Sequence, residues 1–214
     1  MPAMPVADAL ASLTALSGVL MALLRKRETG RGDYIDVAMF DSVLAWTPNV
    51  TGRIFGTGEA HVVKDERSWG GNAMYGLYRT ADDRWLALGG AEVKFARNLL
   101  IPLGREDLIP FAERPPGPEQ EPLRAFLREV FAGRTLADWE AWFADKDVCW
   151  APVRTLKDAF DDPALAARGM LARDGNGHEV VGTPIRFREE PAVIDPTVPG
   201  LDQDGAAIRA RLKP

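Results

Sequence analysis

The feature that most constrains the fold is an uncharged apolar stretch near the N-terminus. Residues 10–24 contain only Leu, Ala, Ser, Thr, Gly, Val and Met, so a helix formed by them can be buried over most of its circumference. The stretch is about fifteen residues long, which is short of the roughly 20 that span a bilayer, and it lacks the basic region that precedes a signal-peptide core. We therefore expect a buried core helix, opened by Pro5 and ended by Gly30 and Gly32.

Asp8 lies at the N-terminal end of this predicted helix. The first backbone N–H groups of a helix have no partner within the helix and carry partial positive charge. A carboxylate at such a position either caps the helix or serves chemistry, and the residues around Asp8 leave both interpretations open.

Composition narrows the class of protein. The chain has 214 residues, of which 46% are hydrophobic and 27% charged, so it can form one large or two small soluble domains. A net charge of -5 disfavours a nucleic-acid surface. A single cysteine, Cys149, cannot form an internal disulfide, which indicates a reducing cytoplasm. Together with two distant histidines, His61 and His178, it offers no credible metal site. We expect Cys149 to be a buried small hydrophobe and both histidines to be solvated loop residues.

The remaining pattern predicts an alternation of short strands and helices. Residues 34–39 read as a strand, Asp41 begins a helix, residues 51–72 form an irregular crossing, and residues 74–88 form a hairpin around an acidic turn. A helix follows over residues 92–103. Thr135 is expected to cap a helix over residues 136–143, with Asp138 completing a capping box. Further helices are predicted at 121–132, 156–160, after Pro163 and at 204–212, and further strands at 147–153, 178–181 and 184–187.

Several short motifs occur in a fixed order along nearly the whole chain. They lie at residues 6–8, 28–32, 35–39, 75–82, 103–105, 151–153, 162–163, 167–170 and 199–201. In sequence and order they resemble the family III CoA-transferases, a group that includes formyl-CoA and carnitine CoA-transferases and the α-methylacyl-CoA racemases. The likeness is to the C-terminal half of a family member only.

The resemblance implies an α/β fold class. It would comprise the C-terminal portion of a Rossmann-like large domain, at residues 1–72, and a small α+β domain, at residues 73–172. Residues 173–214 would return to the large domain. Family members form interlocked homodimers, so the resemblance also implies either a homodimer or a second chain that supplies the N-terminal half.

Asp8 matches the catalytic aspartate of the family. In the transferases, that residue attacks an acyl-CoA to form a mixed anhydride, and the released CoA thiolate then gives an aspartyl-CoA thioester that an acceptor acid captures. The resemblance thus implies acyl-CoA and a carboxylic acid as substrates, with coenzyme A as part of the substrate and no permanently bound cofactor or metal. It implies neither a nucleic-acid nor a membrane partner.

Glu92 is the second candidate catalytic residue. It matches a glutamate that assists proton transfer in the racemase branch of the family, and residues 92–95 and 147–149 look like that branch. Racemisation next to a thioester needs an acid and a base on opposite faces of an enolate. The histidine that the family racemases pair with the aspartate belongs to the half that is absent, and neither His61 nor His178 lies in its motif. A plain first-turn helix carboxylate is the alternative for Glu92.

Four further residues match positions near the substrate or CoA. Met39 corresponds to one near CoA in the transferases and Tyr75 to one near the substrate in the racemases, although each could simply be a core residue. Gly89 and Gly90 could let the backbone approach a thioester, or form a plain turn. The predicted function is therefore CoA transfer, with racemisation of a 2-methylacyl-CoA or a catalytically inactive assembly role as alternatives.

Overall fold

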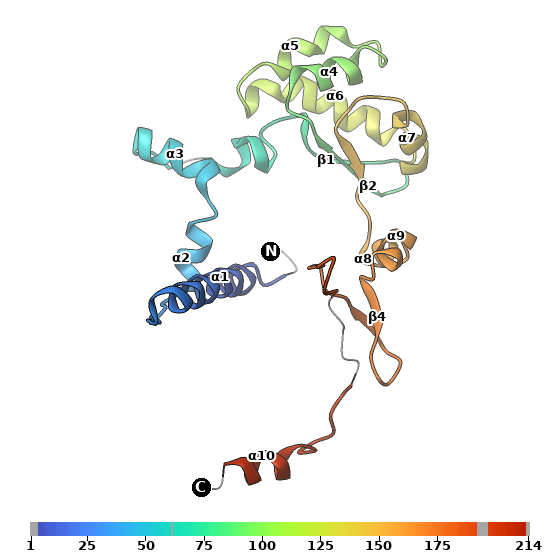
Figure 1. Cartoon of the computed structure of the whole chain (residues 1–214). Helices are drawn as coiled ribbons and strands as arrows, with labels where there is room; N and C mark the ends of the chain where they lie inside the picture. The colour runs from blue at the N-terminus through green and yellow to red at the C-terminus, as the bar shows by residue number, and fades with distance from the viewer. Residues whose placement is uncertain (1–3, 61, 192–196, 213–214) are drawn as a thin grey trace. The chain divides into compact units, whose positions relative to one another are not determined.

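The computed structural model describes residues 4–60, 62–191 and 197–212, and Figure 1 shows the order of its elements. The longer helices are α1 (Val6–Thr29), α3 (Pro48–Thr57), α4 (Val93–Leu100), α6 (Glu121–Ala132) and α7 (Leu136–Phe143). Shorter helices are α2 (Met39–Leu44), α5 (Ile109–Ala112), α8 (Leu156–Phe160), α9 (Pro163–Ala167) and α10 (Gly205–Arg211). Single 3-10 turns are η1 (Val63–Asp65), η2 (Arg67–Trp69), η3 (Glu106–Leu108) and η4 (Pro118–Gln120). The strands are β1 (Tyr75–Arg79), β2 (Trp85–Gly89), β3 (Trp150–Pro152), β4 (Leu171–Arg173) and β5 (Glu179–Val181).

The N-terminal helix α1 has the predicted ends but is more exposed than the sequence predicts. Gly30 ends it with φ of 72°, the left-handed conformation that glycine adopts without strain, and its N–H donates to the Lys26 carbonyl. The predicted burial is wrong, since none of the residues of α1 is buried within the chain. With 24 residues, α1 is also long and apolar enough to cross a bilayer, so the length argument against a membrane span does not hold. Core helices of soluble proteins meet the same criterion.

The chain between α1 and the first sheet also differs from the prediction. Residues 34–38 are extended but form no strand, and the helix begins at Met39 rather than Asp41. This extended segment runs back along α1, where a Cβ on Gly18 would lie 3.1 Å from Ile35 Cγ2. The predicted irregular crossing at residues 51–72 contains the end of α3 and the turns η1 and η2. An alternating pattern makes a strand only beside another strand, and this part of the described chain supplies none.

The predicted hairpin is confirmed. Strands β1 and β2 pair antiparallel, with Tyr75 opposite Gly89 and Leu77 opposite Ala87, and β3 adds to β2 as the third strand. The acidic turn between β1 and β2 contains Asp83 at φ of 62°. Side chains alternate across the sheet, so that one face enters the core and the other faces outward.

The core lies between the inner face of this sheet and helices α4 to α7. Helix α6 packs on β1 and on α5, which in turn contacts α4. The fully buried residues include Leu99, Leu100, Leu123, Leu127 and Phe131. Tyr78 reaches into the same core and donates its hydroxyl to the Ala73 carbonyl at 2.6 Å, and its burial raises the pKa of the phenol.

Helix α7 begins with the predicted capping box. The Thr135 hydroxyl accepts from the Asp138 N–H at 3.2 Å, and the Asp138 carboxylate accepts from the Thr135 N–H at 3.2 Å. The Asp82 carboxylate from the hairpin turn accepts from the Leu136 N–H at 3.1 Å and thereby satisfies another of the first N–H groups of the helix. The hydrogen bond from Thr80 to Asp82 holds the pKa of that carboxyl below its usual value. The hairpin and α7 therefore stabilise each other.

We expect Thr135→Ala to lower the free energy of unfolding by about 1 kcal/mol, because it removes the N-cap acceptor of α7. Urea denaturation measured by circular dichroism checks this value. Thr135→Ser keeps a hydroxyl at the same position and should retain most of the stability. An equal loss in both variants would mean that the methyl group, rather than the capping hydrogen bond, carries the effect.

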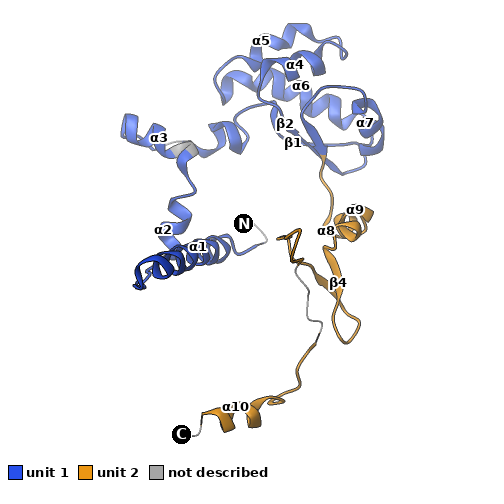
Figure 2. Cartoon of the chain, viewed as in Figure 1, with its two compact units in different colours: residues 1–151 blue, residues 152–214 orange. Residues whose placement is uncertain are grey.

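Contacts divide the chain into two compact units, residues 1–151 and residues 152–214 (Figure 2). The second unit contains the predicted helices α8 and α9 and the antiparallel pair β4 and β5, of which β4 was not foreseen. The strand predicted at residues 184–187 is wrong, since these residues form bends and irregular chain. The division at residues 72 and 172 that the resemblance implies stays a prediction.

Candidate functional site

Asp8 is the third residue of α1, and the N-cap of that helix is Pro5. The capping role that the sequence left open is therefore wrong, since the structure shows no side-chain cap on α1. The Asp8 side chain is exposed in the first turn, where the positive end of the helix dipole favours a carboxylate. This placement leaves the carboxylate available to a ligand.

Met39 begins α2 and is 47% exposed. It does not lie on a strand, so the core role considered for it is wrong. Helices α1 and α2 pack together, so Asp8 and Met39 lie on neighbouring helices.

The structure brings Tyr75, Gly89 and Gly90 together at one end of the three-stranded sheet. Tyr75 lies opposite Gly89 in the register of β1 and β2 and is 37% exposed, which contradicts a core role. The Gly89 N–H donates to the Cys149 carbonyl at 2.9 Å, and the Gly90 N–H donates to the Met74 carbonyl at 3.1 Å. These hydrogen bonds fix the backbone where β2 ends.

Glu92 follows at the N-cap of α4 rather than in the first turn. Its side chain is exposed and makes no capping hydrogen bond, while its carbonyl accepts from the Phe95 N–H at 3.0 Å. Glycine is required at the nearby Gly90, because a Cβ there would lie 2.6 Å from the Phe95 ring. The Glu92 carboxylate is thus held on a fixed backbone and remains free of a structural role in capping α4.

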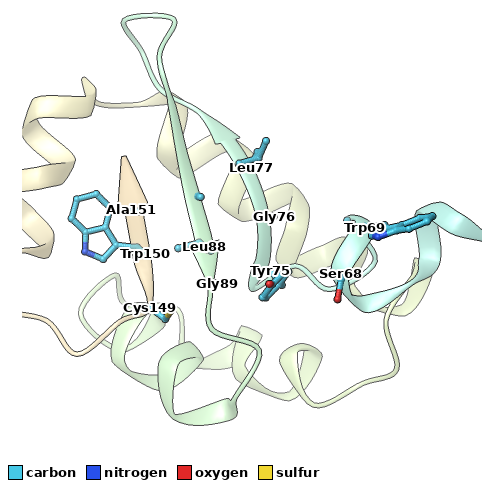
Figure 3. Close-up of a pocket in the computed structure, with 12 residues that line it drawn as sticks. Ser68, Trp69, Tyr75, Gly76, Leu77, Leu88, Gly89, Cys149, Trp150 and Ala151 are labelled. Atoms are coloured by element: carbon cyan, nitrogen blue, oxygen red, sulfur yellow. The ribbon is translucent and has the colours of Figure 1, made fainter. Parts of the chain in front are cut away.

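A cavity of about 650 Å³ lies beside Tyr75 and Gly89 (Figure 3). Sequence reasoning missed the other residues around it. These are Ser68, Trp69, Gly70, Gly76, Leu77, Ala87, Leu88, Cys149, Trp150 and Ala151. Trp69 is followed by two glycines, which indicates that the backbone comes close to another segment here. The sequence does not show which strands pair or in which register, so the lining of the cavity could not be predicted.

Cys149 is exposed and lines this cavity, so the prediction of a buried cysteine is wrong. The cause is that Cys149 precedes β3 at the end of the sheet, beside Gly89, whose lack of a side chain leaves the thiol uncovered. A Cβ on Gly89 would lie 3.3 Å from the Cys149 Sγ.

The histidines do not join this site. His178 is exposed in the turn between β4 and β5, as predicted, and its Nδ1 lies 3.1 Å from Asp174 Oδ2. Hydrogen bonding from the His178 N–H holds the pKa of the Asp174 carboxyl below its usual range. His61 lies outside the described residues. Within those residues, no group of three His, Cys, Asp or Glu side chains is placed to hold a metal ion.

The sequence model of CoA-transferase family III matches residues 1–205 of the chain. The chain belongs to this family. The match extends across α1, the three-stranded sheet and the second unit up to the start of α10, and so includes Asp8, Tyr75 and Glu92.

Individual relatives agree with this assignment. Over 164 residues, the chain is 30% identical to the alpha-methylacyl-CoA racemase of Mus musculus, a match that covers 74% of this chain and 41% of the racemase. Over 204 residues it is 25% identical to an acyl-CoA transferase of Fusarium pseudograminearum (strain CS3096), covering 89% of this chain and 43% of the transferase. The chain therefore spans less than half the length of these relatives.

The fold is also found among solved structures. The crystal structure of Rv3272 from M. tuberculosis matches with a TM-score of 0.75 and 23% sequence identity. The match covers 96% of this chain and 56% of Rv3272. The likeness shows that this chain and Rv3272 share a fold.

Proposed function

We propose that this chain carries the nucleophile of a CoA-transferase and that Asp8 is that residue. The observation that carries the proposal is an exposed carboxylate in the first turn of α1 that is released from capping, within a segment that the family model matches. Carboxylates suit this chemistry because the acid, its anhydride and its thioester exchange readily with an acyl-CoA.

The steps balance without any other reactant. The Asp8 carboxylate attacks the acyl carbonyl, and the C–S bond breaks to give a mixed anhydride and CoA thiolate. The thiolate then attacks the Asp8 carbonyl carbon, which forms the aspartyl-CoA thioester and releases the first carboxylic acid. The acceptor carboxylate then attacks the thioester carbonyl carbon of Asp8 and displaces CoA thiolate, which gives a second mixed anhydride. The thiolate attacks the carbonyl carbon of the acceptor, forms the new acyl-CoA and releases the Asp8 carboxylate, which keeps one oxygen of the acceptor.

The substrates we propose are an acyl-CoA and a carboxylic acid, with CoA bound only as part of the substrate. The exposed apolar residues of α1, including Leu16, Leu20 and Leu24, need a covering surface in water. We propose that α1 and α2 belong to a Rossmann-like large domain, and that the cytoplasmic assembly is either a homodimer or a complex with a chain that carries the N-terminal half of that domain.

Mass spectrometry tests the proposal. The chain is incubated with an acyl-CoA, alone and together with the N-terminal half of a relative, and digested under mildly acidic conditions. A CoA adduct on the peptide that contains Asp8, which disappears when the acceptor acid is added, would support CoA transfer. Without such an adduct in either mixture, the transferase proposal fails and the assembly role becomes the better explanation.

A second candidate function is racemisation of a 2-methylacyl-CoA. The exposed Glu92 carboxylate, which does not cap α4, favours it, and one relative is named as a racemase of this kind. In this reaction Glu92 assists transfer of the α-proton, and a second group on the opposite face returns a proton to the enolate.

If the chain racemises, Glu92→Gln should slow the exchange of the α-proton of a 2-methylacyl-CoA for deuterium by about 100-fold, because the amide cannot accept the proton. Proton NMR in D₂O measures this exchange. Glu106→Gln, a change at another exposed glutamate before a helix, is the matched control and should leave the rate unchanged. Equal rates in all three proteins would exclude Glu92 from the proton transfer.

A further inference from the structure

The outer face of the three-stranded sheet has an unusual distribution of side-chain sizes. Tyr78, Leu86 and Leu88 point into the core, so Leu77 and Ala87 fall on the opposite face, where they are paired in the register. Two small residues, Ala87 and Gly89, lie on this face of the middle strand β2, and the larger Leu77 and Trp150 lie on the strands beside it. The result is a hollow in the sheet surface rather than a flat face (Figure 3).

One wall of the hollow is formed by residues 68–70 and is fixed by the backbone that follows. Gly71 accepts a hydrogen bond from Arg124 Nη2 at 2.7 Å and another from the Gly117 N–H at 2.8 Å. A Cβ on Gly71 would lie 2.1 Å from the Asp65 carbonyl oxygen, so only glycine allows this approach. The wall that carries Trp69 is therefore preformed, which lowers the entropic cost of binding a ligand.

The lining of the hollow selects an apolar ligand. None of its twelve lining residues, all within the described chain, carries a charge, and the polar side-chain groups are the hydroxyls of Ser68 and Tyr75, the thiol of Cys149 and the indole N–H groups of the two tryptophans. Phosphates would meet no cation here, whereas hydrocarbon would bury the exposed surfaces of Trp69 and Leu77. A volume of about 650 Å³ lies in the range of small-molecule sites.

We propose that this hollow binds the apolar acyl chain of the thioester substrate and that Cys149 closes one end of it. The inference rests on the proposed acyl-CoA chemistry and adds the substrate class, an acyl group with an extended aliphatic part. Because Cys149 Sγ would lie only 3.3 Å from a Cβ at Gly89, the thiol occupies the space beside the glycine and limits the length of chain that fits.

The thiol provides its own reporter, since Cys149 is the only cysteine in the chain. We would measure the rate at which N-ethylmaleimide modifies it in the presence of S-decyl-CoA or S-methyl-CoA, thioethers that have no free thiol. At ten times its dissociation constant, S-decyl-CoA should slow the modification about tenfold, because only the unliganded protein reacts. S-methyl-CoA, which lacks the chain, should slow it less than about twofold.

Two variants in the hollow sharpen the test. Ala87→Leu fills the floor and should abolish the protection by S-decyl-CoA, and Leu77→Asn should weaken it at a position that is 61% exposed and does not support the core. Ala125→Leu, which adds the same side chain to the exposed face of α6, is the matched control and should keep full protection.

Equilibrium dialysis of both thioethers separates the possible failures. If both bind but Cys149 reacts at the same rate throughout, the acyl chain lies elsewhere and only this inference is overturned. If neither binds, the proposed acyl-CoA function fails with it. Modification that slows with increasing protein concentration and ignores both thioethers would mean that a second copy covers this face, which also overturns the inference.

Discussion

Asp8→Asn is expected to abolish the CoA adduct and to reduce CoA transfer by about a thousandfold or more, because the amide is not a nucleophile for the acyl carbonyl. The substitution keeps the size of the side chain. It also leaves the cap of α1 unchanged, since Pro5 occupies the N-cap. A loss of activity would therefore report the carboxylate chemistry rather than the stability of the helix, and circular dichroism confirms that α1 is retained.

Isotope transfer makes this prediction specific to the mixed-anhydride route. With an acceptor acid labelled with ¹⁸O in both oxygens, each turnover should leave one labelled oxygen on Asp8, and mass spectrometry of the peptide detects it. Asp41→Asn, at another exposed first-turn carboxylate, is the matched control and should show normal transfer. Turnover that leaves no label on Asp8 would exclude the nucleophilic role.

Phe131→Ala is expected to lower the free energy of unfolding of the first unit by about 4 kcal/mol, through lost burial and the cavity left behind. Phe131 has no exposed surface, and its ring centroid lies 5.3 Å from that of Tyr78 and 5.0 Å from that of Trp139. Its carbonyl also accepts the Trp139 Nε1–H at 3.0 Å, so a shift of α6 would disturb α7. Urea denaturation followed by tryptophan fluorescence measures the change.

Two controls distinguish this effect from a general sensitivity to loss of an aromatic ring. Phe131→Leu keeps most of the volume and should cost less than half as much. Phe55→Ala removes a side chain that is 83% exposed on α3 and should leave the stability within about 0.5 kcal/mol of the wild type. A small loss from Phe131→Ala would show that α6 and α7 close around the cavity.

Local signals in the sequence were enough to locate much of the first unit. The spacing of Leu123, Leu127 and Phe131 predicted α6 with its observed ends, and the capping box of Thr135 predicted the start of α7. The acidic turn predicted the hairpin of β1 and β2. These features depend on residues a few positions apart in the sequence, so the sequence alone is enough to predict them.

Features that depend on distant partners were not predictable. Residues 34–38 alternate like a strand but have no strand beside them, and α1 is apolar yet exposed within the chain. The cavity depends on the register of β1 and β2 and on the end of β3, which bring Leu77, Ala87 and Cys149 to one face. For the candidate site, the family resemblance suggested Asp8, Tyr75 and Glu92, whereas the cavity around Tyr75 depends on strand pairing that the sequence does not specify.

The short link between β2 and α4 combines a tightly packed backbone with an exposed side chain that does not contribute to that packing. Gly90 is buried, its N–H donates to the Met74 carbonyl, and its backbone lies against the Phe95 ring. The side chain of Glu92, two residues later, is exposed and makes no capping hydrogen bond to α4. The backbone at Glu92 is thus set by its neighbours and not by its own side chain. A single codon change there can add or remove a carboxylate while the core keeps its packing, so the charge at this position can vary without refolding.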